Sequence, residues 1–167
     1  LIAAVVPSMV ISVFNETIEA LNNTLFDSGY QLMLGQSDYS SEREELLLDS
    51  VIGRRPDGIF LAGVMHPSKG RARLMASGIP VVETWDLTPT PIDMLIGFSH
   101  KDIGLAVANY LIKKGKKRLA VIRAGDERAD RRTVAYQEAI AQAGLPPPFV
   151  VNVGGERSIH SGRAAMA

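Results

Sequence analysis

Three arginines, Arg128, Arg131 and Arg132, lie close together after an apolar run at residues 119–123. The run is predicted to be a parallel strand, and open α/β sheets bind ligands beyond the carboxyl ends of such strands. A guanidinium group forms charge-assisted, often bidentate hydrogen bonds with a carboxylate or a phosphate. The segment therefore has the chemistry to bind an anion. The alternative is a solvated loop in which the arginines pair with the acidic residues at 126–130.

A second polar group, Glu83, Trp85 and Asp86, lies at the end of another predicted strand. An indole ring can stack on the carbon face of a sugar while a carboxylate accepts hydrogen bonds from its hydroxyls. Phe14 is a second candidate for the carbon face, and Asp38 follows a further strand in the same way. The alternative for Trp85 is a tryptophan packed at the rim of the molecule beneath a proline-containing loop.

His100 lies at the predicted start of a helix over residues 99–114. Ser99 and Asp102 have the spacing of a capping box, with the carboxylate at the positive end of the helix dipole. A neutral imidazole at this position can donate or accept a hydrogen bond. His100 is therefore a candidate to bind ligand hydroxyls, and the alternative is an exposed residue at a helix start.

The composition excludes several classes of protein. Eighteen basic residues balance eighteen acidic ones in 167 residues, so no overall charge attracts nucleic acid or an anionic membrane. The absence of cysteine excludes disulfides and is compatible with a reducing cytoplasm. No apolar run has the length of a membrane span, and no membrane association is expected.

Common enzyme motifs are missing. No glycine-rich dinucleotide motif follows the first apolar run, and neither a phosphate-binding loop nor a Gly-x-Ser-x-Gly elbow occurs. No spacing of His, Asp and Glu matches a set of metal ligands. We therefore predict no catalytic residue, no cofactor and no metal site, and expect that the chain is not an enzyme.

Apolar runs of strand length alternate with segments of helical periodicity. Most of the runs are continuous in Val, Ile, Leu and Ala, as in strands buried on both faces of a parallel sheet. The alternation predicts an α/β fold with a doubly wound parallel sheet. The predicted strands are 2–6, 30–36, 58–62, 80–84, 94–98, 119–123 and 149–153. The predicted helices are 12–28, 41–53, 68–77, 99–114 and 131–143, with Ser41 and Glu44 forming a second capping box.

Short sequence fragments in a fixed order resemble the LacI/GalR family of transcriptional repressors. The fragments are LIAAVVPS, DSGYQLML, RRPDGIFL, SGIPVVETWD, KKGKKRLAVI and AGLPPP. Within the family, ETWDLTPTPIDMLIGFSH and GDER are most similar to gluconate-type repressors. Residues 96–122 resemble the crossover that opens the family's second lobe and read as one βαβ unit.

The resemblance implies a periplasmic-binding-protein-like, bilobal effector-binding domain. Residues 1–96 would form the first lobe and residues 97–167 an incomplete second lobe, with the seam following the polar stretch at 84–93. The chain begins with Leu and ends at the start of a further helix, so we interpret it as a fragment without the DNA-binding headpiece. The family further implies a cytoplasmic homodimer that binds operator DNA through that headpiece.

The resemblance also implies a ligand. The expected effector is a small sugar or sugar acid such as gluconate, bound in the cleft between the lobes. From the chemistry of the side chains, its expected contacts are Arg128 and Arg132 at the carboxylate, His100 and Asp86 at the hydroxyls, and Trp85 or Phe14 at the carbon face. Asp38 is a further effector-binding candidate.

One departure from the family concerns the first loop. Val10 and Ile11 stand where the family usually has a hydrogen-bonding pair, so direct recognition of the effector from that loop is not expected. Two alternatives remain open, a periplasmic sugar-binding protein of a transport system and a small flavodoxin-like α/β enzyme.

Overall fold

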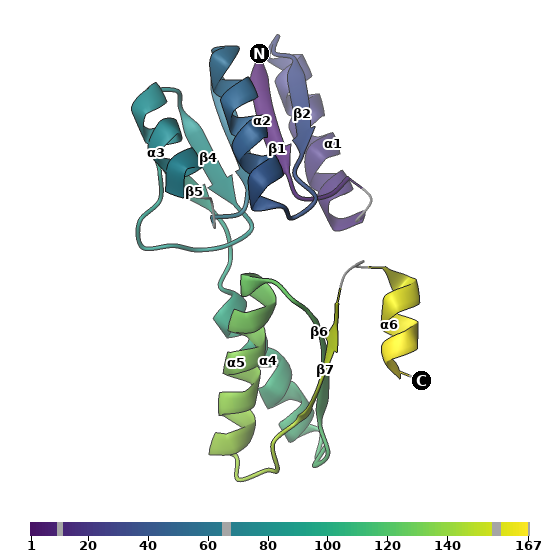
Figure 1. Ribbon diagram of the computed structural model, residues 1–167. Coiled ribbons are helices and arrows are strands. Elements are labelled where there is room, and N and C mark those ends of the chain that lie inside the picture. The colour runs from purple at the N-terminus through teal and green to yellow at the C-terminus, as the bar shows by residue number, and fades with distance from the viewer. Residues whose placement is uncertain (10–11, 65–67, 155–157, 167) are drawn as a thin grey trace. The chain divides into compact units, whose positions relative to one another are not determined.

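The computed structural model describes residues 1–9, 12–64, 68–154 and 158–166 (Figure 1). The chain forms two compact units, Leu1–Phe98 and Ser99–Ala167, called here the first and the second unit. Helices and strands alternate, and neighbouring strands pair in parallel in both units. The predicted α/β class is confirmed. No helix within the described ranges is both long enough and apolar enough to cross a membrane.

The first unit contains a five-stranded parallel sheet with the order β2-β1-β3-β4-β5. Its strands are β1 (Ile2–Val6), β2 (Leu32–Gln36), β3 (Gly58–Ala62), β4 (Val81–Thr84) and β5 (Met94–Ile96). The four strands predicted for this sheet are confirmed as parallel, and β5 extends it beside β4.

Two of these strands begin later than predicted. The amide of Tyr30 donates to the carbonyl of Leu25 at 2.8 Å, so it caps the end of the preceding helix and does not join the sheet. Pro80 has no N–H to donate to a sheet ladder, and β4 accordingly begins at the next residue.

Three helices accompany this sheet: α1 (Ser12–Asp27), α2 (Ser41–Gly53) and α3 (Ser68–Ser77). The capping residue of α2 is Ser40. The prediction of Ser41 as the cap is wrong by one residue. Ser40 has an extended backbone, and its hydroxyl accepts a hydrogen bond from the amide of Arg43 at 3.3 Å. Only the residue before the first helical turn can make this contact.

The core of the first unit lies on the sheet face that carries odd-numbered residues. Helices α2 and α3 cover this face, and α1 lies on the opposite side of the sheet (Figure 1). The opposite face buries Ala4 and Val6 of β1. Burial on both faces explains why β1 is continuously apolar. The buried core residues are Ala3, Val5, Leu48, Val51, Ile59, Leu61, Leu74 and Val81.

The part of the second unit that the structure describes contains two parallel strands and three helices. Its elements are α4 (His100–Lys113), β6 (Ala120–Ala124), α5 (Glu127–Gln142), β7 (Phe149–Val153) and α6 (Ile159–Met166). The interpretation of residues 96–122 as one βαβ unit is wrong. Strand β5 pairs with β4 in the first unit, whereas β6 pairs with β7 in the second, so the strands on either side of α4 belong to different sheets.

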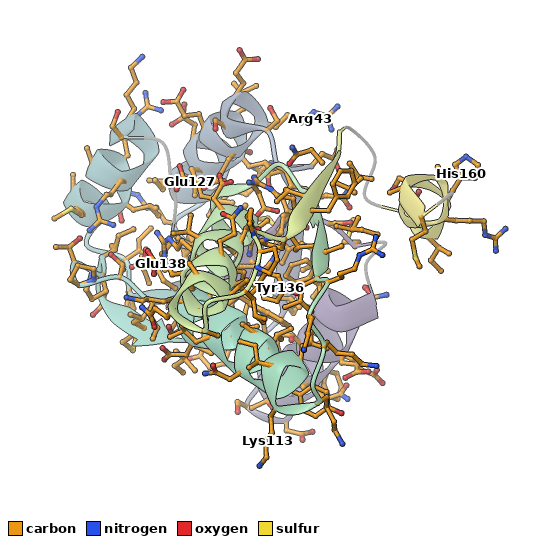
Figure 2. All side chains as sticks on the ribbon, turned by 90° about the horizontal axis from the view of Figure 1, so that it is seen from below. Arg43, Lys113, Glu127, Tyr136, Glu138 and His160 are labelled. Carbon is orange, nitrogen blue, oxygen red and sulfur yellow. The ribbon has the colours of Figure 1, made fainter. Side chains whose placement is uncertain are left out.

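Close packing of α4 against α5 forms the core of the second unit. A Cβ atom added to Gly104 of α4 would lie 2.2 Å from the carbonyl oxygen of Arg132, so only glycine allows this approach. Tyr136 and Ile140 of α5 are buried there beside Ala108 of α4. Figure 2 shows the position of Tyr136 on α5.

Candidate functional site

Three aromatic rings meet at the carboxyl edge of the first unit's sheet. The Trp85 ring lies 5.1 Å from the Phe14 ring at an interplanar angle of 61° and 5.8 Å from the Phe98 ring at 75°. These are edge-to-face contacts of the kind that aromatic pairs favour. Phe14 is buried and Trp85 is partly exposed. The structure thus brings together Phe14 and Trp85, both predicted site residues, and adds Phe98, which the sequence analysis did not single out.

The backbone around Trp85 adopts an uncommon conformation. Trp85 has a φ angle of +68°, in the left-handed region that bulky residues rarely occupy. A Cβ atom on Gly97 would lie 2.0 Å from the carbonyl oxygen of Asp86, so the chain after β5 passes directly against the chain after β4. Such strained conformations persist where the surrounding structure enforces them.

The two acidic residues beside Trp85 are both buried. Asp86 is 1% exposed, and its Oδ1 accepts a hydrogen bond from the amide of Leu87 at 2.7 Å. Glu83 is 0% exposed, and its Oε2 accepts from the amide of Ile92 at 2.6 Å. Both carboxylates thus accept hydrogen bonds from the protein's own backbone, and Glu83, unlike Asp86, lies within β4 itself.

Asp38 lies at the same edge of the sheet but follows β2, which β1 and β3 separate from β4. Its backbone is also left-handed, with a φ angle of 51°. Its carboxylate accepts hydrogen bonds from the side chains of Gln36 and Arg43. Asp38 thus belongs to a local network at the start of α2, and the structure does not group it with Trp85.

The arginine cluster of the second unit lies on a helix and not in a loop. Helix α5 begins at Glu127, four residues before the predicted start. Asp126 caps it, with Oδ1 accepting from the amide of Ala129 at 2.8 Å. Arg128 and Arg132 are four residues apart on this helix and therefore share one of its faces. Their place in the first two turns puts both near the positive end of the helix dipole.

Arg132 and His100 contact each other. The Nη1 atom of Arg132 lies 2.8 Å from the Nδ1 atom of His100. His100 is 5% exposed at the first position of α4, and the cap on Ser99 is present, with Oγ accepting from the amide of Asp102 at 3.1 Å. The alternative that His100 is an exposed helix-start residue is wrong. The packing of α4 on α5 brings together two predicted site residues that are 32 positions apart.

The acidic residues near the arginines have other structural roles. Asp126 caps α5, as described above, and Asp130 forms an ion pair with Arg123 of β6. Arg123 was not a candidate in the sequence analysis, because an arginine at a strand end reads as an ordinary edge residue. The segment is therefore a capped helix and not the loop that the alternative assumed.

Other predicted features bear less on the site. Within the described ranges, no group of three or more His, Asp or Glu side chains could hold a metal ion. His160 is exposed on α6 (Figure 2). Val10 and Ile11, the departure from the expected first loop, lie outside the described residues.

Comparison with known proteins identifies the family. Residues 1–162 match the family described as periplasmic binding proteins and sugar binding domain of LacI family. The HTH-type transcriptional regulator GntR of Pseudomonas aeruginosa is 33% identical over 165 residues, covering 93% of this chain and 48% of the relative.

Two solved structures agree with this match. A LacI family transcriptional regulator from Silicibacter pomeroyi superimposes with a TM-score of 0.90 at 30% identity, covering 98% of this chain and 62% of that one. Transcription regulator GntR from Chromobacterium violaceum gives 0.83 at 29% identity, covering 93% and 58%. The alternative of a flavodoxin-like enzyme is wrong, because residues 1–162 match this family.

The chain spans about half the length of the curated relatives it matches, between 46% and 49% of each. It nevertheless matches the family over nearly all of its own residues. The chain therefore belongs to the family described as periplasmic binding proteins and sugar binding domain of LacI family.

Proposed function

We propose that this chain senses a small sugar acid, such as gluconate, and that binding of this effector controls the attachment of a DNA-binding headpiece to operator DNA. The main support is the arrangement on α5, where Arg128 and Arg132 share one face of the first two turns. Two guanidinium groups near a helix N-terminus attract a carboxylate through both their charge and the helix dipole.

The remaining predicted residues have roles consistent with such a ligand. His100, held by Arg132, serves as a hydrogen-bonding partner for hydroxyl groups. In the first unit, the partly exposed Trp85, with Phe14 packed against its ring, is proposed for the carbon face and Asp86 for a hydroxyl, whereas Asp38 is engaged with Gln36 and Arg43. The effector acts by binding two conformations of the regulator with different affinity.

Removal of an arginine tests the anionic effector. In the full-length protein, Arg128→Ala is expected to weaken gluconate binding by roughly two to three orders of magnitude, since losing one partner of a charge pair costs about 2–5 kcal/mol. Glucitol has the same carbon chain without the carboxylate, and its binding should change little. Isothermal titration calorimetry with both ligands measures this difference.

Arg118→Ala is the matched control, because it removes an exposed arginine of the same unit. Equal losses for gluconate and glucitol, or no loss for either, would assign Arg128 to a structural role and contradict the proposal of an anionic effector.

We also propose that the intact regulator is a cytoplasmic homodimer that pairs through helices of the first unit. A two-fold symmetric protein matches a two-fold symmetric operator. Sedimentation velocity of the full-length protein at micromolar concentration should show a dimer, and a monomer under these conditions would contradict this part of the proposal.

A further inference from the structure

A buried ion pair lies beneath the loop that follows Asp86. Glu83 of β4 is fully buried, and its Oε1 atom lies 3.8 Å from Nη1 of Arg71 on α3. Arg71 is only 27% exposed. A carboxylate removed from water needs a nearby cation or several hydrogen bonds to remain charged. Arg71 thus explains how a glutamate can occupy the interior of the sheet.

Both members of this pair also hold the loop at residues 87–93. The other carboxylate oxygen of Glu83 accepts from the amide of Ile92 at 2.6 Å, and Nη2 of Arg71 donates to the carbonyl of Thr90. At the end of the loop, Asp93 accepts from the amide of Val81 at 3.2 Å. The loop is therefore attached to β4 and α3 through charged side chains, in a stretch without helix or strand.

The attached loop continues directly from the two predicted ligand contacts. Trp85 has a left-handed backbone, and Asp86 is packed against Gly97. Neither residue lies within a strand or helix whose ladder of hydrogen bonds would hold it. This conformation must then be maintained by two kinds of contact. One is the attachment of the loop to Arg71 and Glu83, and the other is the packing of Trp85 against neighbouring aromatic rings.

We propose that Arg71 and Glu83 form a clasp that holds the loop at 87–93 and thereby positions Trp85 and Asp86 for the effector. Both are positioning residues, since Glu83 is fully buried and Arg71 acts through the loop. The part of this inference that concerns the effector rests on the proposed function. The part that concerns the loop does not.

The test compares two arginines of the same helix. Arg71→Met removes the clasp, whereas Arg73→Met removes an exposed arginine of α3 that pairs with Asp49. Trp85 is the only tryptophan in the 167 residues, so its fluorescence reports on this position. Each variant is prepared in the full-length protein with and without Trp85→Phe, and the difference gives the signal of Trp85 alone.

Arg71→Met is expected to increase acrylamide quenching of Trp85 and to weaken gluconate binding about tenfold. Arg73→Met should change neither quantity, and Arg71→Lys should restore part of both. Equal quenching of Trp85 in the Arg71→Met and Arg73→Met variants would overturn the clasp.

Two further measurements distinguish a variant that fails to fold from an effector that fails to bind. If Arg71→Met alone does not fold, the double variant Arg71→Met/Glu83→Gln removes the buried charge and decides the question by the same quenching measurement. If gluconate binds none of the proteins, the proposed effector is wrong, while increased quenching after loss of Arg71 still supports the clasp.

Discussion

The two units hold their candidate ligand contacts by different means. In the first unit, Trp85 and Asp86 follow β4, and the chain there is defined by its backbone, with a left-handed residue at Trp85 and the close approach of Gly97 to Asp86. In the second unit, packing of α4 against α5 fixes His100 and Arg132 through their side chains. The arrangement in the first unit therefore depends on Gly97 itself, where a Cβ atom would meet Asp86. The arrangement in the second unit depends instead on how closely α4 packs against α5.

The largest expected effect tests whether the units unfold separately. Leu48 of α2 and Ile140 of α5 are both fully buried, each in the core of its own unit. Truncation of either to Ala should cost about 3–4 kcal/mol of unfolding free energy, because a cavity remains. Hydrogen exchange measured by mass spectrometry should show faster exchange in the first unit for Leu48→Ala and in the second unit for Ile140→Ala. Faster exchange in both units for either variant would show one cooperative body.

Glycine substitutions test the helix interface of the second unit. Gly104→Ala places a methyl group against the carbonyl of Arg132 and should destabilise the unit by about 2 kcal/mol, although alanine favours helix. Gly162 in α6 has open space at its Cβ position, so Gly162→Ala should instead stabilise α6 by about 0.5–1 kcal/mol. Urea denaturation measures both. Stabilisation by Gly104→Ala would show that α4 can move away from α5 without cost.

Each unit has a helix whose first turn is capped by a similar hydrogen bond, so the two units can be compared by removing these caps. Ser40 caps α2 and Asp126 caps α5, each through one hydrogen bond to a backbone amide. Alanine at either position should cost about 1 kcal/mol, and Asn should retain most of the cap. Thermal unfolding of the Ala and Asn variants of each residue gives the comparison. An Asn variant as unstable as its Ala variant would argue against capping.

The smallest expected effect concerns the pH dependence of the second unit. Burial raises the pKa of the Tyr136 phenol above its usual value, and the hydroxyl donates to the carbonyl of Ala120 at 3.3 Å. The unfolded chain releases this proton near pH 10 while the folded chain retains it, so stability falls as the pH rises above about 10. Tyr136→Phe should cost about 1 kcal/mol at neutral pH and should remove part of the alkaline loss. Urea denaturation between pH 8 and about 11 checks this, and an unchanged alkaline slope would contradict it.

Much of the fold could be predicted because its signals are local. Continuous apolar runs indicated the buried parallel strands, and the capped start of α4 was predicted at Ser99. The start of α5 was missed, because Asp126 within a run of charged residues resembles a turn as much as a helix cap. That error placed Arg128 and Arg132 in a loop and concealed that they share a helix face.

The contacts of the candidate site depend on tertiary structure that no local pattern specifies. The Phe14–Trp85 contact joins α1 to the end of β4, and the His100–Arg132 contact requires the close approach at Gly104. All four residues were candidates from the sequence, Trp85 through its place at a strand end and the others through their chemistry, but their pairing was not predicted. Like Trp85, Glu83 and Asp38 were nominated by their place at a strand end, yet the carboxylates of both are engaged within the protein. Position at a strand end therefore identifies candidates but not their partners.

The contact between Arg132 and His100 determines where the imidazole carries its proton. A guanidinium group has only donors, so Nδ1 of His100 must present its lone pair and the ring hydrogen resides on Nε2. His100 is thus held as the Nε2–H tautomer, and a second proton would place two donors against each other. Nitrogen-15 NMR of the imidazole should show a pyridine-like Nδ1 and a pyrrole-like Nε2. With its Nδ1 lone pair directed at Arg132, the ring acts through Nε2 as a donor and not as an acceptor.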